Sequence, residues 1–173
     1  ACHHRAPHLG GRGMTSPLPP RRADTALAAI LLALPSQQDD SLRACWAVDE
    51  DGRISDISPV DAAAEVEARA KQGRTLPVIA LAPAAATNVH ALLFDDLPVK
   101  QAQAAARLLA AQKSLGSPDD QHIVAGEPRS EDGAIPVASA SAALMTRWIA
   151  LTRAAGLDPD SITPASTILP TPE

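Results

Sequence analysis

The chain has 173 residues, a mass of 17.9 kDa, a net charge of −5 and 46% hydrophobic residues, enough for one substantial domain or two small lobes. Aromatic residues are only 2% (Trp46, Trp148 and Phe94), so we expect a core of Leu, Ile, Val and Ala. Single-stranded nucleic-acid binders combine aromatic platforms with basic grooves, and this acidic chain is therefore not expected to bind nucleic acid.

The first 24 residues are rich in Pro, Gly, Arg and His without an apolar period, which predicts a disordered tail ahead of one folded lobe over 25–173. Met14 is an alternative natural start. Metal-ligating side chains crowd the tail, but without paired spacing they favour adventitious metal binding over a structural zinc site. These side chains are Cys2, His3, His4 and His8.

The run "ALAAILLAL" over 26–34 follows Arg21 and Arg22 and admits two interpretations. A signal peptide has this outline, but Asp24 interrupts the flank and no small-x-small cleavage site follows. We predict a buried strand over 27–34. No apolar run reaches the ~20 residues that span a bilayer, so we predict no membrane span. Two cysteines make no disulfide framework and suit a reducing cytoplasm.

The segment 42–58 predicts two strands around Asp51-Gly52, joined by a type I′ turn. An Asp-x-Gly phosphate loop of the actin kind is the alternative. The acids of "DEDGR" would repel an anion, and the chain has neither G-x-x-x-x-G-K-[ST] nor G-x-G-x-x-G. We therefore predict a structural turn and no nucleotide-binding loop.

A helix is predicted to open at Ser58, with Pro59 in its first position and Asp61 as the capping-box acid, and to end at Gly73. The next runs, 76–83 and 88–94, read as strands, the first covered on both faces. A helix over 98–115 follows, capped by Asp95-Asp96. We predict that one stripe packs it on the sheet, with a partner surface as the alternative. The stripe comprises Ala104, Leu108, Ala111 and Leu115.

Two short strands over 121–126 and 134–139 come next, then a helix that starts near Ser139 or Ser141. Spacings of 4, 3 and 4 predict its core face, formed by Leu144, Trp148, Leu151 and Ala155. Gly156 stands at its C′ position with Leu157 folding back behind it, and 161–163 adds a strand. The order β-β-β-α-β-β-α-β-β-α-β predicts an α/β fold with a mixed sheet flanked by helices.

The candidate chemical groups do not form a coherent set. Cys45 reads as a small buried thiol, and His90 and His122 as structural strand histidines rather than general bases. The acidic pairs at 39–40, 95–96 and 119–120 fall at segment boundaries, where turns and helix caps explain them. We therefore predict no catalytic, cofactor-binding or metal-binding residues and no enzymatic activity.

The strings "TLPVIALAPAAATNVHALLF", "LPVKQAQAAARLLAAQKSLG", "DQHIVAGE" and "ALMTRWIALTRAAGLDPDSITPASTILPTPE" resemble the cytoplasmic part of type II secretion system protein L, the GspL family. The resemblance is most specific at Trp148, Ala155-Gly156, Pro159-Asp160, Pro164 and Leu169-Pro170. It covers roughly 76–173, is weaker over 25–58, and excludes 1–24.

The resemblance implies an actin-like, RNase H-related fold without nucleotide machinery. It also implies a scaffold that holds the hexameric secretion ATPase (the E component) at the inner membrane, associates with the M and F components, and often forms homodimers. Family members continue into a second cytoplasmic lobe, a transmembrane helix and a periplasmic domain. We therefore expect a truncated or fragmentary chain, and the family's motifs identify no partner-contact residues.

The leading hypothesis is accordingly a non-enzymatic assembly domain, the first cytoplasmic lobe of a type II secretion L protein at the inner face of the inner membrane. One alternative is an actin-like nucleotide-binding protein related to the pilus-assembly M proteins. Another is a degenerate fragment without a function of its own, which would unfold with poor cooperativity.

Overall fold

The computed structural model describes residues 27–36, 41–113 and 117–167. Its strands and helices follow the order β1-β2-β3-α1-β4-β5-α2-β6-β7-α3-β8, which confirms the predicted order of elements and the mixed α/β class. Short 3₁₀ turns occur at Ala84–Ala86, Pro118–Asp120 and Ala165–Thr167. The predicted tail over 1–24, with its Cys and His residues, lies outside the described residues, as do Asp39, Asp40 and Leu115.

The larger sheet has five strands in the order β3-β2-β1-β4-β8. β1 pairs antiparallel with β2, and β2 with β3, whereas β4 runs parallel to β1 and β8 parallel to β4. The strands are β1 Leu27–Ala33, β2 Ala44–Asp49, β3 Ile54–Asp56, β4 Val78–Ala82 and β8 Ser161–Pro164. Short connections join the antiparallel strands, and helices lie in the crossovers, as the geometry of parallel pairing requires.

One face of this sheet carries the main core. Strand pairing places Ile30 beside Ala47 and Val78, all below 5% exposed, and α1 (Pro59–Lys71) and α3 (Ala142–Ala154) contribute to the same cluster. On the opposite face Leu31 pairs with Trp46 and Ile79. That row is half-buried and lies outside the cluster. The expectation that the strand at 76–83 is covered on both faces is therefore wrong for one face.

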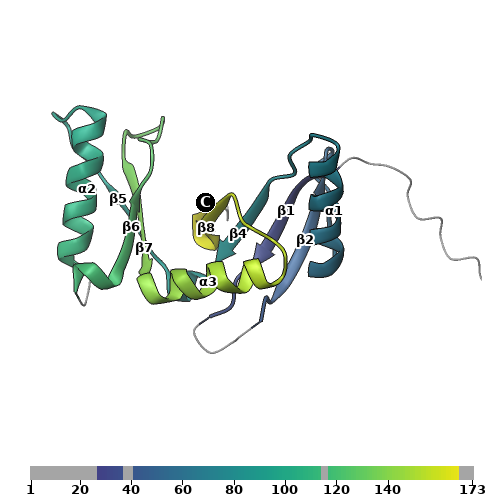
Figure 1. Cartoon of the computed structure of the whole chain (residues 1–173). Helices are drawn as coiled ribbons and strands as arrows, with labels where there is room; N and C mark the ends of the chain where they lie inside the picture. The colour runs from purple at the N-terminus through teal and green to yellow at the C-terminus, as the bar shows by residue number, and fades with distance from the viewer. Residues whose placement is uncertain (1–26, 37–40, 114–116, 168–173) are drawn as a thin grey trace, which may run out of the picture.

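The smaller sheet is an insertion between β4 and α3. Its strands β5 Asn88–Leu92, β6 Gln121–Ala125 and β7 Ile135–Ser141 run antiparallel in the order β5-β7-β6, and α2 (Val99–Lys113) covers one face. A second buried cluster fills this contact. Figure 1 shows α2 and this sheet at one end of the molecule, β1, β2 and α1 at the other, and α3 running between them.

Strand β7 links the two cores. Its early residues Ile135 and Val137 belong to the α2 cluster, whereas Ala140 near its end belongs to the main cluster. The chain then enters α3 directly after Ser141, the N-cap residue, whose side chain makes no capping hydrogen bond. Trp148, in the middle of α3, is fully buried, which confirms the prediction that this residue packs in the core.

The helix boundaries follow local rules. The Ser58 hydroxyl accepts a hydrogen bond from the Asp61 amide at 3.1 Å and donates one to its carboxylate at 2.7 Å, so the predicted cap of α1 is present. At the end of α3 the Leu157 amide donates to the Thr152 carbonyl and the Gly156 amide to Arg153, both at 2.9 Å. This pattern is a Schellman motif, and Gly156 has the positive φ, 74°, that it requires.

The predicted packing stripe of α2 is wrong. The buried residues are Ala102, Ala106 and Ala110, whereas Ala104 is exposed and Leu108 is 66% exposed. Small side chains allow α2 to lie close to the bulky Ile135 and Val137 on β7, which fills the interface without leucine from the helix.

Candidate functional site

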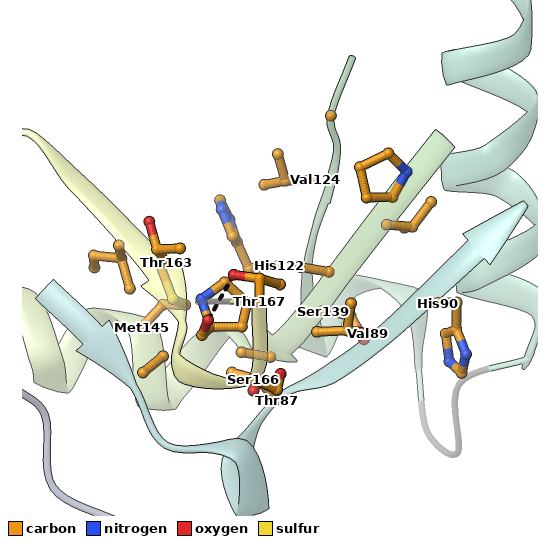
Figure 2. Close-up of a pocket in the computed structure, with 18 of the residues that line it drawn as sticks. Thr87, Val89, His90, His122, Val124, Ser139, Met145, Thr163, Ser166 and Thr167 are labelled. Atoms are coloured by element: carbon orange, nitrogen blue, oxygen red, sulfur yellow. Dashed lines mark hydrogen bonds between the residues drawn. The ribbon is translucent and has the colours of Figure 1, made fainter. Parts of the chain in front are cut away.

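A cleft of about 760 Å³ lies where the two sheets meet. The small sheet contributes Val89, His122 and Val124 from the face that α2 leaves uncovered, and His90 also borders the cleft. The large sheet contributes Thr163 and Pro164 from the end of β8. α3 contributes Met145 and Trp148, while Ser166 and Thr167 follow from the last 3₁₀ turn. Figure 2 shows His122, Val124, Met145 and Thr163 projecting from separate elements toward one space.

Strand register explains which side chains reach the cleft. His122 pairs with Ala140, and Val124 and Val89 both pair with Ala138, so these residues share one face of the sheet. His90 pairs with Val137, whose side chain is buried on the α2 side. The two histidines that the sequence singles out therefore point to opposite faces of the small sheet, and His90 projects away from Val89 (Figure 2). Both are exposed, and they form no catalytic pair.

The hydroxyl groups at the cleft are partly used by the backbone. Thr87 Oγ1 donates to the Pro83 carbonyl at 3.2 Å and Thr167 Oγ1 to the Pro164 carbonyl at 2.7 Å. Arg129, at the rim, has its guanidinium group paired with the Asp132 carboxylate. The cleft therefore offers aliphatic contact and a few hydrogen-bonding groups, and none of these contacts joins a nucleophile to a base.

The Asp51-Gly52 hairpin is closed by its own carboxylate. Asp49 Oδ1 accepts hydrogen bonds from the Asp51 amide at 3.0 Å and the Arg53 amide at 2.8 Å, and the Gly52 amide donates to the Asp49 carbonyl at 3.0 Å. The loop thus holds Glu50, Asp51 and Gly52 between the paired Asp49 and Arg53, one residue more than the predicted type I′ turn. These amides are occupied and acidic side chains surround them, so this turn does not provide a phosphate cradle.

The other residues singled out by the sequence occupy structural positions. Cys45 is 4% exposed on the core face of β2, and burial raises the pKa of its thiol, which keeps it protonated. Asp95 and Asp96 lie in the turn before α2, and Asp119 and Asp120 in a 3₁₀ turn. The predicted cap of α2 by Asp95-Asp96 is not among its contacts, and the first helical amides, those of Gln101 and Ala102, donate to the Pro98 carbonyl.

Within the described residues no three His, Cys, Asp or Glu side chains gather as a metal site. None of the helices in these residues has the length and apolar character of a membrane span. The surface cleft itself is the feature that sequence analysis missed, because it is built from residues such as His122 and Thr167 that only the tertiary fold brings to one place.

Comparison with solved structures shows which fold this is. The chain is similar to the cytoplasmic domain of EpsL, an inner-membrane component of the type II secretion system of Vibrio cholerae, with a TM-score of 0.57 and 16% identity over 83% of this chain. It spans 60% of the length of that domain. It also aligns with a PilM–PilN type IV pilus biogenesis complex at a TM-score of 0.45 and 15% identity, over 80% of this chain and 47% of the other.

No protein-family model matches the sequence, and no curated protein matches it. The fold is therefore that of a GspL-type cytoplasmic domain, and the resemblance found in the sequence is confirmed at the level of the fold. What the chain does is a separate inference.

Proposed function

We propose that the chain is a non-enzymatic assembly domain of the inner-membrane platform of a type II secretion system and that it docks the cytoplasmic secretion ATPase, the E component. The observation that carries the proposal is the likeness to the EpsL cytoplasmic domain over 83% of this chain. Fold alone does not determine function, so the proposal also depends on the chemistry of the described residues.

That chemistry favours contact over catalysis. The hairpin amides beside the actin-like sheet are held by Asp49, and the cleft supplies aliphatic and hydroxyl groups without a nucleophile–base pair among its contacts. We further propose that the M and F components and a second copy of the chain contact this domain, and that it works at the cytoplasmic face of the inner membrane. In this account 25–173 form one lobe of a larger cytoplasmic domain.

Co-purification tests the proposal. The chain, tagged and shown by circular dichroism to be folded, is expressed with the E component of the same organism and isolated through the tag. The E component should co-elute, and an unrelated hexameric ATPase of similar size should not. Absence of the E component from the eluate of a folded chain contradicts the proposed docking.

A thermal-shift measurement separates the scaffold from the nucleotide-binding alternative. A ligand at about 100 times its Kd stabilises the folded state by about 2.7 kcal/mol. We expect Mg-ATP to leave the unfolding midpoint unchanged. A clear stabilisation by Mg-ATP would favour the alternative.

A further inference from the structure

Strand β5 has one edge that no other strand covers. It pairs with β7 along its other edge over all five residues, in an unbroken register from Asn88 to Leu92. Within the described residues β5 makes no hydrogen bond outside this pairing. Its first four residues are exposed. A row of backbone N–H and C=O groups therefore points outward from β5, and such a row is a template for pairing with another strand.

Helix α2 leaves this edge open. The helix packs on β6 and β7, and on that side Gln103 Nε2 donates to the carbonyl of Gly126, the residue after β6, at 3.0 Å. Lys100 and Arg107 lie three residues before and four residues after Gln103 and so share its flank of the helix. These two cations therefore lie away from β5, and a partner strand can approach the free edge without meeting them.

The other three edges of the two described sheets carry features that oppose pairing. β3 has only three residues, one of them the charged Asp56, and β8 ends at Pro164, which has no N–H to donate. In antiparallel pairing of β6 with a second β6, centred on Ile123, Asp119 would stand opposite Glu127, and like charges placed so are destabilising. Among the edges in this part of the chain, only β5 lacks every one of these features.

A second copy of the chain fits this edge in one register. Both copies must use the same edge, because β7 occupies the other, and antiparallel strands can pair so about a two-fold axis. Parallel strands would need a shift of one residue, which breaks the two-fold symmetry. Antiparallel pairing of all five residues places His90 opposite His90 of the second copy and Val89 opposite Ala91. Just beyond the strand ends Thr87 meets Leu93, so no like charges face each other there.

We propose that β5 is a dimerisation strand, through which two copies pair antiparallel and join two three-stranded sheets into one sheet of six strands, with His90 beside the two-fold axis. The inference deepens the part of the proposed function that concerns a second copy. It is carried by the free edge itself and is tested without the E component, so that failure of dimerisation and failure of ATPase docking can be told apart.

Opposite charges at position 90 test the pairing. Sedimentation equilibrium of the full chain at about 10–100 µM should show a dimer. His90→Glu and His90→Lys each place like charges against one another at the axis, and each should weaken the dimer at least about 5-fold. An equimolar mixture of these two variants should form a heterodimer, because opposite charges then face each other. Native mass spectrometry distinguishes the heterodimer from either homodimer by mass.

His122 provides the matched control, because it is also an exposed strand histidine but lies on β6. His122→Glu and His122→Lys should leave the dimer unchanged, and circular dichroism checks that all four variants keep the fold of the parent. The proposal is overturned if the parent chain is monomeric at about 100 µM, if substitutions at 90 and 122 weaken the dimer equally, or if the mixture of the two His90 variants forms no heterodimer.

Discussion

The indole Nε1 of Trp148 donates a hydrogen bond to the backbone carbonyl of Pro35 at 2.9 Å, across 113 residues of chain. Both residues are fully buried. The bond fixes the middle of α3 to the segment that directly follows β1, and α3 is also the element that begins directly after β7. One side chain therefore helps to position the small sheet relative to the large sheet, and with it the walls of the cleft.

Removing this bond should destabilise the fold. Trp148→Phe keeps much of the apolar volume but leaves the buried Pro35 carbonyl without its donor, which costs about 1–3 kcal/mol. Trp148→Ala adds a cavity and should cost about 3–5 kcal/mol. Urea unfolding followed by circular dichroism measures both. Trp46→Phe, at a half-buried site, is the control, and an unchanged unfolding free energy for Trp148→Phe contradicts this role.

Asp160 should be required for the pairing of β8 with β4. Its carboxylate accepts a hydrogen bond from the Val78 amide at 2.8 Å, and its own amide donates to the Val78 carbonyl at 2.8 Å. Asp160→Ala leaves the amide of the buried Val78 (2% exposed) without its acceptor. This should lower the free energy of unfolding by about 1–3 kcal/mol. Asp158→Ala removes only an exposed pair with Arg153 and should cost less than about 1 kcal/mol. If the two variants lose the same unfolding free energy in urea, Asp160 has no special role in pairing β8 with β4.

Two glycines with the same backbone conformation should respond differently to alanine. Gly73 (φ +70°) has open space around it, whereas a Cβ at Gly156 (φ +74°) would lie 3.3 Å from the Ala63 Cβ. Gly73→Ala should cost about 1 kcal/mol for the positive φ alone, and Gly156→Ala more. Adding Ala63→Gly to Gly156→Ala should remove the extra destabilisation that comes from the contact between the two Cβ atoms. A double-mutant cycle with no coupling between 63 and 156 contradicts the contact.

Alkaline pH should weaken the fold through Cys45. Burial raises the pKa of this thiol in the folded state, so the unfolded chain loses its proton first, near pH 8.5. The unfolded state then binds fewer protons than the folded state, and the free energy of unfolding falls as pH rises above that value. Cys45→Ala should show a smaller decline from pH 8 to 10. Parallel pH profiles would exclude the thiol as the cause.

The thiol should also be protected from reagents. In a Cys2→Ser background only Cys45 can react with a disulfide reagent, and its labelling should follow the rate of unfolding, increasing with urea. Rapid labelling of the folded protein contradicts its burial.

The order of elements could be predicted because its signals are local. Ser58 and Gly156 mark helix ends by their own backbone chemistry, and the spacing of Leu144 and Trp148 shows which side of α3 is buried. The packing of α2 could not be predicted, because an alanine-rich helix has small side chains on two of its faces. Which face packs on the small sheet depends on the volume that Ile135 and Val137 of β7 already supply. Leu108 makes the exposed face of α2 look like the packing face in the sequence, although the side chain is 66% exposed.

The cleft illustrates a second limit. His122 is visible in the sequence as a strand histidine, but its neighbours in the cleft come from β8, α3 and the turn at Thr167, and no short-range pattern links them. The loop of the β2–β3 hairpin is one residue longer than predicted for a related reason. The Asp49 carboxylate accepts the amides of the loop and stabilises three residues where the Asp-Gly pair alone favours two.

The most direct test of the central claim is the affinity of the purified chain for the N-terminal domain of the secretion ATPase from the same organism, measured by isothermal titration calorimetry. The account predicts a specific complex with a Kd of about 1–10 µM, the same with and without Mg-ATP. A folded chain that shows no binding at about 100 µM, together with stabilisation of that chain by Mg-ATP, would contradict it.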